Sequence, residues 1–379
     1  MQSTRLIFPS LMIVLGALTL AGCDSVQGDV TADEGIRLSQ TITGIRFDWS
    51  TYQRLAGGSD NWPITWCEDD NQYTSWGDGG GFGGTNNDGR VSLGFARIEG
   101  DYPNFTGHNV WGGKNPENPS DFAGKVTSML CLNGVLYGWR STSSGDAGLR
   151  WKQIVRSRDK GATWEENVFR TSRVVGDEPG RPGLPYFINY GKNYSANRDG
   201  YVYIYTIQIE NPNRWEVQKP GIVWLARAPV AFEAFADTAA WEWVVTLDDD
   251  YNPTWGYFAD RVPVLEDPDG MMRSSAIYNP GLNRFLMITN HTARNEGNLA
   301  VWEAPQPWGP WSLVMKEFGW PDNDPNAPPE DVVKRNFAYG NFSPKWLSTD
   351  GKRCVMVWFR PDSWNSVACE ILVNDAGAT

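Results

Sequence analysis

Two aspartates, Asp60 and Asp78, stand at the two outer ends of a predicted β-hairpin. If this hairpin turns at residues 68–71, an antiparallel register places Asp60 directly opposite Asp78, with the two Cβ atoms about 5 Å apart. Carboxyl groups at that distance titrate as a coupled pair, and one of them holds its proton more tightly. Glycoside hydrolysis needs one carboxyl group that donates a proton and one that activates water or attacks the sugar. The alternative is a pair that binds a structural calcium ion or caps turns.

Other polar side chains are predicted to reach the same site from neighbouring strand ends. Asp260, which precedes Arg261, is the candidate for a third catalytic acid. The candidate substrate contacts are Lys125, Ser128, Asn193, Tyr194, Arg273, Tyr278, His291 and Lys345, with His108 on a loop that overhangs the site. Several cations around a carboxylate pair favour an acidic or sulfated polymer, or a hydroxyl-rich sugar. For some of these residues the alternative is a solvated charge on the rim of the fold.

Three functions from different classes fit these residues. The first is a glycoside hydrolase that uses Asp60 and Asp78. The second is a polysaccharide lyase, in which Tyr194 or one of the two histidines takes a proton beside a uronate while Arg273 neutralises its carboxylate. The third is a glycan-binding protein without catalysis, which would hold the sugar on exposed tryptophans. Ultraviolet absorbance separates the first two, because only a lyase creates an unsaturated uronide.

The elements that must hold these residues are predicted to be short strands. The chain contains 20 Trp, 14 Tyr, 16 Phe, 40 Gly and 24 Pro, a composition that favours strands joined by tight turns. Roughly every 65 residues, an apolar strand, a turn and an aromatic-rich strand recur. The five copies begin at Asn61, Val126, Tyr190, Arg273 and Phe342, and a third strand is predicted over 91–99, 149–157, 221–228, 298–303 and 366–373.

Repeats of this size are typical of propeller blades, each of which buries its faces against its neighbours. The sequence therefore predicts an all-β, five-bladed β-propeller in a single domain, residues 42–379, in which the segment 42–49 completes the last blade. Residues 157–164 also match the pattern S-x-D-x-G-x-T-W, which resembles the Asp-box turn of sialidases. Its side chains are predicted to hold a hairpin turn between outer strands, without a catalytic role.

The N-terminus has the pattern of a bacterial lipoprotein signal. A short basic region with Arg5 precedes an apolar run at 6–20, and Leu-Ala-Gly-Cys ends at Cys23. The apolar run is too short for a good transmembrane helix. We therefore expect residues 1–22 to be removed, Cys23 to carry the lipid, and residues 23–41 to form a polar tether. The protein is expected in the cell envelope, either periplasmic or exposed at the surface.

Charge and cysteine content limit the partners. The net charge of −12 argues against nucleic acid, which needs a basic footprint. Only two histidines are present, so a multi-histidine zinc site is not expected, and no cofactor is predicted apart from a structural calcium ion. Four cysteines remain after lipidation, which makes disulfides plausible in an oxidising compartment. We predict a Cys354–Cys369 disulfide, with Cys67–Cys131 as a second candidate.

Several short segments also carry a family resemblance, at 59–63, 76–79, 189–194, 198–203, 278–282, 308–311 and 344–351. Over residues 47–372 the chain resembles a group of exported propeller proteins of long-unknown function, similar to bacterial endo-D-arabinanases. The resemblance implies a propeller fold, an arabinan-like substrate and catalytic aspartates at the positions of Asp60 and Asp78. Gly-Asp-Gly stands at 77–79 where those enzymes have Gly-Asp-Thr, a departure that bears on the substrate more than on the fold.

Overall fold

The computed structural model describes residues 35–141, 153–170, 180–211, 215–231, 237–328, 337–360 and 362–374. The predicted signal peptide, the lipidation site Cys23, the first part of the tether and the start of the predicted strand at 149–157 lie outside the described residues. No helix in the described ranges has the length and apolar character needed to cross a membrane. These ranges contain strands and short 3-10 turns, in agreement with the predicted all-β class.

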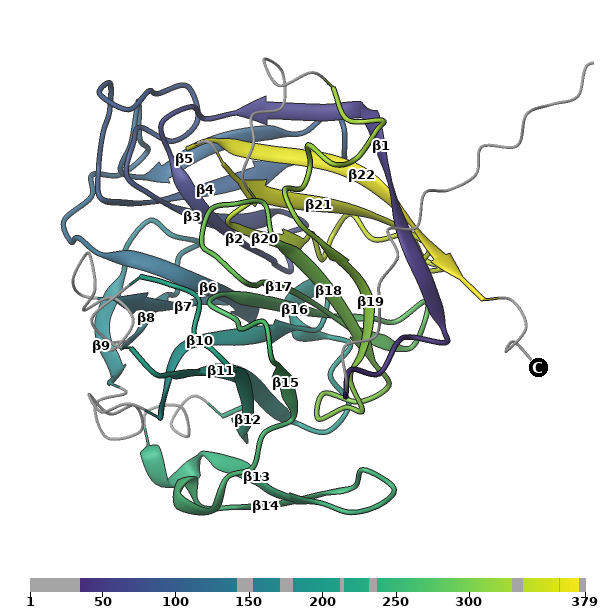
Figure 1. Ribbon diagram of the computed structural model, residues 1–379. Helices are drawn as coiled ribbons and strands as arrows, with labels where there is room; N and C mark the ends of the chain where they lie inside the picture. Colours follow the sequence, from purple (N-terminus) through teal and green to yellow (C-terminus); the bar gives the residue numbers. More distant parts are fainter. Residues whose placement is uncertain are drawn as a thin grey trace, which may run out of the picture.

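The described strands form four sheets, and the ten-stranded one divides at its parallel β10–β16 pairing, which gives five antiparallel groups (Figure 1). The first group contains β2 (Asp60–Trp66), β3 (Gln72–Gly77), β4 (Leu93–Glu99) and β5 (Thr106–Trp111), and the second contains β6 (Lys125–Leu132), β7 (Val135–Ser141), β8 (Gln153–Ser157) and β9 (Glu165–Arg170). The third contains β10 (Arg181–Asn189), β11 (Tyr201–Ile209), β12 (Gly221–Pro229), β13 (Glu242–Leu247), β14 (Pro253–Gly256) and β15 (Leu265–Asp267). The fourth contains β16 (Ser274–Asn279), β17 (Arg284–Asn290), β18 (Leu299–Ala304) and β19 (Ser312–Glu317). The fifth contains β20 (Tyr339–Phe342), β21 (Arg353–Phe359), β22 (Trp364–Val373) and β1 (Ile42–Leu55).

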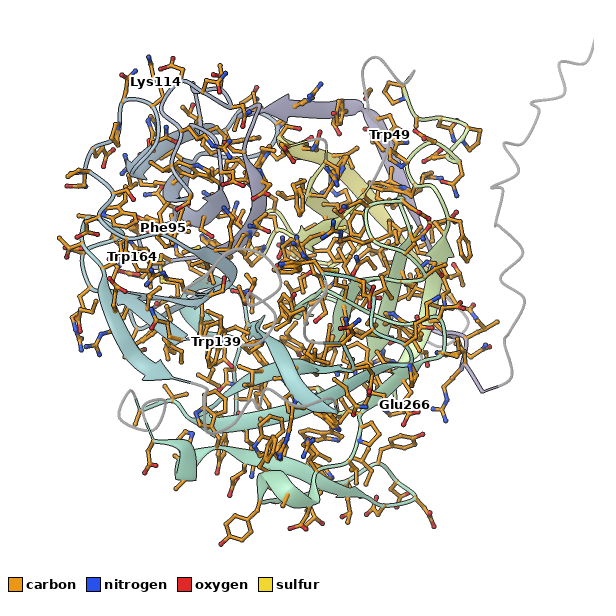
Figure 2. All side chains as sticks on the ribbon, turned by 60° about the vertical axis from the view of Figure 1, so that its left-hand side comes forward. Trp49, Phe95, Lys114, Trp139, Trp164 and Glu266 are labelled. Carbon is orange, nitrogen blue, oxygen red and sulfur yellow. A yellow bond between two sulfur atoms is a disulfide. The ribbon has the colours of Figure 1, made fainter. Side chains whose placement is uncertain are left out.

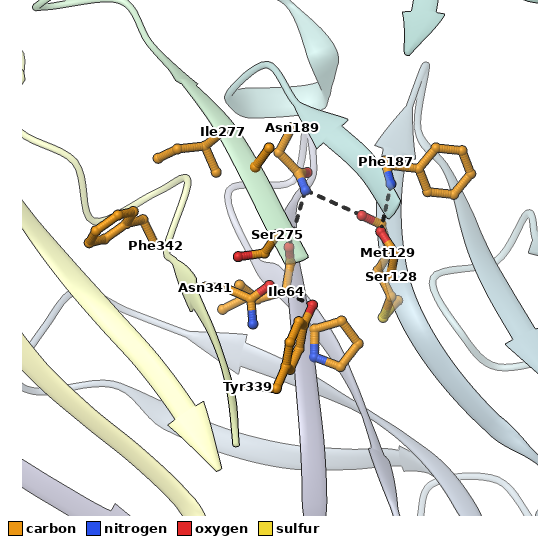
Figure 3. Close-up of a pocket in the computed structure, with 12 residues that line it drawn as sticks. Ile64, Ser128, Met129, Phe187, Asn189, Ser275, Ile277, Tyr339, Asn341 and Phe342 are labelled. Carbon is orange, nitrogen blue, oxygen red and sulfur yellow. Dashed lines mark hydrogen bonds between the residues drawn. The ribbon is translucent and has the colours of Figure 1, made fainter. Parts of the chain in front are cut away.

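The first strand of every group lies at a common axis. One narrow pocket is lined by residues from β2, β6, β10, β16 and β20 together (Figure 3). At its wall the Asn189 side-chain amide donates to the carbonyl oxygens of Ile64 and Met129, and the Phe187 amide donates to the Ser128 hydroxyl over 2.9 Å. A short parallel pairing between β10 and β16 joins the third and fourth groups into one sheet. Curved antiparallel sheets around one axis fit a β-propeller.

The axis has two ends. The leading end is where the innermost strands begin, at Asp60, Lys125, Arg181, Ser274 and Tyr339. The turn end is where these strands finish and turn into the second strand of their group. Residues near the two ends of one innermost strand are therefore separated by the length of that strand, and only those at the leading end share a site with Asp60.

The N-terminal strand pairs with the C-terminal one. β1 runs antiparallel to β22, with Phe47 opposite Cys369, and the two lie side by side as the purple and yellow arrows of Figure 1. Phe47 and Trp49 are buried, and their rings lie 5.0 and 5.7 Å from the ring of Trp320. The predicted pairing is thus observed over a longer strand. Just before β1, the Ser39 amide donates to the Leu313 carbonyl oxygen over 2.8 Å, so the end of the predicted tether lies against β19.

The third and fifth repeats begin earlier than the sequence predicted. The strand expected from Tyr190 is β10, which ends at Asn189, and the one expected from Phe342 is β20, which ends there. In both cases the polar residues that follow belong to the turn after the innermost strand. A pattern of turn residues between two apolar runs does not by itself show on which side of the turn the first strand stops. This offset decides where three predicted site residues lie.

The cysteines pair differently from the main prediction. Cys67 and Cys131 form a disulfide with a Cα–Cα distance of 5.3 Å, linking the turn ends of β2 and β6. Cys354 and Cys369 are free, buried and directly opposite each other in β21 and β22. The prediction of a Cys354–Cys369 bridge was therefore wrong. Residues directly opposite in antiparallel strands have Cβ atoms about 4.5–5.5 Å apart, whereas a disulfide needs about 3.8 Å.

Removing the observed disulfide should lower stability. We expect the double variant Cys67→Ser, Cys131→Ser to lose about 2–4 kcal/mol of unfolding free energy, because the bridge restrains the unfolded chain. Urea denaturation followed by circular dichroism measures this loss against the parent. Alkylation of the unfolded, non-reduced protein followed by mass spectrometry should label Cys354 and Cys369 and leave the other pair unlabelled. Labelling of Cys67 or Cys131 in the parent would contradict the assignment.

The turn at residues 157–164 connects β8 to β9, the two outer strands of the second group. Asp159 accepts hydrogen bonds from the Ser157 hydroxyl over 2.8 Å and from the Thr163 amide over 2.9 Å. The Trp164 indole donates to the Gly161 carbonyl oxygen over 3.1 Å. The Trp164 ring stacks on Phe95 of the neighbouring group at 3.8 Å between ring centroids (Figure 2). The turn therefore packs two groups together and lies away from the central axis.

Candidate active site

Asp60 is the first residue of β2 and lies at the leading end of the axis. Its partner across β2 and β3 is Gly77, and Asp78 follows directly after that strand. The predicted register holds from Ile64 to Trp66 and then shifts by one residue at an irregularity between Asn61 and Ile64. The prediction that Asp60 stands directly opposite Asp78 was therefore wrong by one position. The two carboxyl groups still belong to one electrostatic cluster, because the charge of Asp78 raises the pKa of Asp60.

The small size of Gly77 makes room for this cluster. A Cβ atom at Gly77 would come within 2.4 Å of Asp60 Oδ1, 2.5 Å of Lys125 Cδ and 2.8 Å of Asn61 Nδ2. Side chains from β2 and β6 thus converge over the backbone of residue 77. The side-chain amide of Asn61 also donates from Nδ2 to Asp60 Oδ1 over 3.1 Å, which orients that carboxyl group. Asp60 is positioned by its neighbours on two strand groups.

The environment of Asp60 favours its protonated form. Burial raises the pKa of Asp60 from 3.8 to about 6, because few water molecules can solvate the charged form. The neighbouring carboxyl groups of Asp78 and Asp362 raise this pKa further, while Lys125 and Arg273 lower it. A carboxyl group with a pKa near 6 can hold a proton and release it close to neutral pH.

Asp78 sits in a different environment, held between two cations. Lys125 Nζ lies 2.8 Å from Asp78 Oδ1, and Arg90 Nη2 lies 3.3 Å from the same oxygen atom. The Lys125 ammonium group also donates to the Ser92 carbonyl oxygen over 2.7 Å. These contacts fix a carboxylate beside Asp60 and supply its positive partners from the protein. They also argue against the calcium alternative, because the cations that such a site would need are already in place.

The backbone around the two aspartates is strained. Asn61, Trp62 and Asp78 have φ angles of 79°, 64° and 54°, in the left-handed region that non-glycine residues rarely adopt. Strained residues of this kind persist only where surrounding structure holds them, and they cluster at functional sites. Here Trp62 is fully buried and stacks on Trp76 at 5.8 Å between ring centroids. The aromatic core below the site thus holds the conformation that presents Asp60.

Arg273 brings a further cation to the leading end. It precedes β16, and its Nη1 donates to Asn61 Oδ1 over 3.1 Å. Its guanidinium carbon lies 5.1 Å from the ring centroid of Trp215, 5.2 Å from that of Phe359 and 5.9 Å from that of Tyr339. Asn61 therefore connects Arg273 to Asp60. Of the predicted site residues, the structure brings together Asp60, Asp78, Lys125 and Arg273.

Ser128 lies deeper along the same axis. It is buried in β6, accepts the Phe187 amide and lines the central pocket with residues of all five groups (Figure 3). A hydroxyl group already engaged with the backbone of the next strand holds two groups together. Ser128 lies below the carboxyl cluster, so its main role is this structural hydrogen bond and not a direct contact with substrate.

Four predicted substrate contacts lie at the turn end. Lys345 follows β20 and its Nζ lies 3.1 Å from Asp70 Oδ2, in the turn between β2 and β3. Asn193 accepts the Gly134 amide over 2.7 Å, and Tyr194 is buried with its hydroxyl donating to the Tyr201 carbonyl oxygen. The fourth is Tyr278, near the end of β16, whose hydroxyl donates to Asn283 Oδ1 over 2.8 Å. Their assignment to the site was wrong because of the strand offset described above and, for Tyr278, because it ends rather than begins its strand.

Neither histidine reaches the carboxyl pair. His108 lies in β5, the outermost strand of the first group, with Nε2 3.6 Å from Glu99 Oε2, and not on an overhanging loop. His291 is fully buried, with Nδ1 2.9 Å from Thr292 Oγ1 and Nε2 3.1 Å from the Glu317 carbonyl oxygen. Burial lowers the pKa of His291 to about 4, so this ring is neutral at neutral pH. Both predictions of substrate contact were wrong.

Asp260 is also separated from the site. It is exposed at the end of the short 3-10 helix η5 (Phe258–Asp260), which packs on the outer strand β13. The prediction of a third acid there was wrong, because this segment belongs to the periphery of the third group. Besides Asp78, the carboxyl group that raises the pKa of Asp60 is that of Asp362, in the connection from β21 to β22 at the leading end.

Sequence reasoning missed several residues of the cluster, namely Asn61, Arg90, Trp215 and Asp362. Asn61 stands beside Asp60, so the predicted strand end contained a signal for it. Arg90 and Trp215 lie in loops between strands. Loop residues follow no strand period, so spacing alone cannot indicate which of them fold back onto the axis.

Among the described residues, one group of side chains has its potential metal ligands close together: Cys67, Glu68 and Cys131. Its two sulfur atoms form the disulfide, so they cannot act as thiolate ligands. This group is therefore part of a covalent link between β2 and β6.

No protein-family model matches the chain, and no curated protein is similar to it in sequence. Similar solved structures include a GH43_1 enzyme from Xanthomonas citri, at 12% identity and a TM-score of 0.48 over 87% of this chain and 93% of that one. A GH62 α-L-arabinofuranosidase from Coprinopsis cinerea gives 9% identity and 0.47 over 88% and 97%. An α-L-arabinofuranosidase from Podospora anserina, solved with cellotriose, gives 10% and 0.45 over 90% and 98%. At these TM-scores, the fold and the site stand on the strand pairing and contacts given above.

Proposed function

We propose that the protein is a glycoside hydrolase that cleaves an extracellular polysaccharide with Asp60 and Asp78. The observation that carries this proposal is the contrast between the two carboxyl groups. Burial raises the pKa of Asp60 to about 6, whereas Asp78 is held by Lys125 and Arg90. A buried carboxyl group with a raised pKa, beside a second one held by two cations, supplies the acid and the base or nucleophile that glycosidic cleavage requires.

Each residue of the cluster has a role in this reaction. Asp60 donates its proton to the leaving oxygen of the glycosidic bond, and Asp78 activates water or attacks the anomeric carbon. Lys125 and Arg90 hold the Asp78 side chain in position, and Asn61 orients Asp60.

The finer features of the protein belong to the same proposal. The five strand groups would be five propeller blades, closed by the pairing of β1 with β22. Lipidation at Cys23 would hold the enzyme in the cell envelope, periplasmic or at the surface. The resemblance of the sequence to endo-D-arabinanases supports an arabinan-like glycan, and the cations at the site support an acidic or sulfated one.

The two alternative functions have less support. A lyase with His108, His291 or Tyr194 as base would need that group beside Arg273, and all three lie elsewhere or are buried with their polar atoms bonded. A binding protein would need exposed tryptophans. The large apolar side chains exposed in the described ranges are Leu55, Tyr257 and Phe318.

A panel of polysaccharides tests the proposal directly. Purified protein without the leader is incubated with arabinans, uronate-containing and sulfated polymers, and products are separated by chromatography and weighed by mass spectrometry. We expect products whose mass shows addition of one water per cleaved bond and no new ultraviolet absorbance. Unsaturated products would show a lyase instead, and binding without cleavage of any polymer would show a binding protein.

A further inference from the structure

We propose that Arg273 is the receptor for a carboxylate group of the glycan, so that the natural substrate contains uronic acid residues. This inference rests on the proposed glycan specificity and deepens it. Its basis is the unusual setting of one guanidinium group at the leading end, beside Asp60 but, in the part of the chain that the structure describes, without an ion pair to a carboxylate.

The guanidinium group of Arg273 is held in place without being neutralised. Among the residues that the structure describes, its polar contact is one hydrogen bond, from Nη1 to Asn61 Oδ1. The rings of Trp215, Phe359 and Tyr339 surround it at 5.1–5.9 Å from its central carbon. A guanidinium group has five N–H donors, so most of the donors of Arg273 are left for another partner.

Such an arrangement is costly unless a ligand completes it. Arg273 is shielded enough from water that burial lowers its pKa, and the nearby charge of Arg294 acts in the same direction. Removing a cation from water without pairing it is unfavourable. Asp60, the carboxyl group that acts electrostatically on Arg273, must carry a proton to act as the acid, so in the reacting state it does not neutralise Arg273.

The chemistry of the group indicates what the ligand is. A guanidinium fork binds the planar carboxylate through two parallel hydrogen bonds, and aromatic rings on its faces fix its plane. The other cations near Asp60 are engaged, since Lys125 and Arg90 both contact Asp78. Exposed Arg294 lies in the loop after β17, close enough to Arg273 to add positive potential there. A uronate bound at this point would lie next to the catalytic acid.

Binding of small sugars tests the inference independently of turnover. Methyl glucuronide, methyl glucoside and methyl glucoside 6-sulfate are titrated into the protein at constant ionic strength and followed by ligand-observed NMR. The wild-type protein should bind the glucuronide at least tenfold more tightly than the glucoside, and Arg273→Met should abolish that preference. Arg273→Lys keeps the charge without the fork and should bind the glucuronide and the sulfate about equally.

The matched control is Arg46→Met. Arg46 lies in the outer strand β1, and its exposed guanidinium group is paired with Glu370 of β22. This variant should keep the wild-type preference. Equal binding of glucuronide and glucoside by the wild type overturns the inference, as does a preference that survives in a folded Arg273→Met variant. A tighter complex with the sulfate in the wild type would replace the uronate by a sulfated sugar and overturn it too.

The Asp60→Asn variant separates this inference from the proposed function. It should lose hydrolysis but keep the glucuronide preference, because it retains Arg273. If it keeps full hydrolysis while the preference depends on Arg273, the proposed catalytic pair fails and the uronate site stands. If the enzyme cleaves glycans through Asp60 but shows no such preference, only the uronate site fails.

Discussion

Asn at position 60 should lower glycan hydrolysis by roughly 100-fold or more, because a positioned proton donor typically contributes at least that factor. Asn keeps the shape of the side chain and its contact with Asn61, so the fold should survive. Turnover is measured on the polymer that the parent cleaves, and folding by circular dichroism. Asp78→Asn should cause a loss of the same order, since it removes the carboxylate held by Lys125 and Arg90.

The pH dependence of both activity and stability follows from the same carboxyl group. Since Asp60 must be protonated to act as the acid, kcat/KM of the parent should fall as pH rises through about 6. Its folded pKa is raised, so between pH 4 and 6 the folded state binds more protons than the unfolded state, and stability falls as pH rises there. Asp60→Asn removes this penalty, so its free energy of unfolding at pH 7 should exceed that of the parent by up to about 3 kcal/mol.

The control for the catalytic pair is Asp260→Asn. This residue is an exposed aspartate at the edge of the third strand group, so its variant should retain the turnover of the parent. Near-parent turnover of both Asp60→Asn and Asp78→Asn would contradict the proposed pair. A large loss in Asp260→Asn would restore that residue as the third acid.

Trp49→Ala should lower the free energy of unfolding by about 3–5 kcal/mol, the usual cost of truncating a buried tryptophan. Trp49 is 8% exposed, and its indole donates to Asp324 Oδ2 over 2.8 Å. Its ring lies 5.7 Å from that of Trp320, in the connection after β19, and 6.3 Å from that of Trp358, in β21 of the fifth strand group. The variant therefore weakens the contact by which β1 completes the sheet arrangement.

Urea denaturation with two probes measures this effect. Far-ultraviolet circular dichroism and tryptophan fluorescence should both report the lower midpoint, because β1 and β22 share one sheet. Tyr257→Ala is the control, since that ring is 83% exposed and should change stability little. An unfolding midpoint for Trp49→Ala equal to that of the control would show that β1 adds little to the fold.

Strand pairs were predictable from sequence where a turn separates two clear apolar runs, as in β2–β3, β6–β7 and β16–β17. The same reasoning placed Asp60, Asp78, Lys125 and Arg273 at strand ends that prove to share one end of the axis. It failed where the backbone departs from regular geometry. A strand period carries no information about the shift between Asn61 and Ile64 that moved the cross-strand partner of Asp60 to Gly77.

Side chains on loops and turns were the other source of error. Tyr194 and Lys345 follow the third and fifth innermost strands, and their apparent place at the leading end came from strands begun too late in the chain. Burial of a polar side chain could not be predicted from the sequence either. His291 has the pattern of a polar residue at a strand end, but its ring is enclosed and both ring nitrogen atoms are hydrogen-bonded. Directly opposed cysteines in β21 and β22 likewise suggested a bridge that the sheet geometry leaves unformed.

The pairing of β1 with β22 also decides at which end of the axis the N-terminal part of the chain joins the sheets. Ile42 lies opposite Val373, and β22 runs from the leading end at Trp364 toward the turn end. The chain thus enters the sheets from the side opposite Asp60. If Cys23 is lipidated as proposed, the anchored part of the chain joins the sheets at the turn end, and the carboxyl pair lies at the other end of the axis from that attachment.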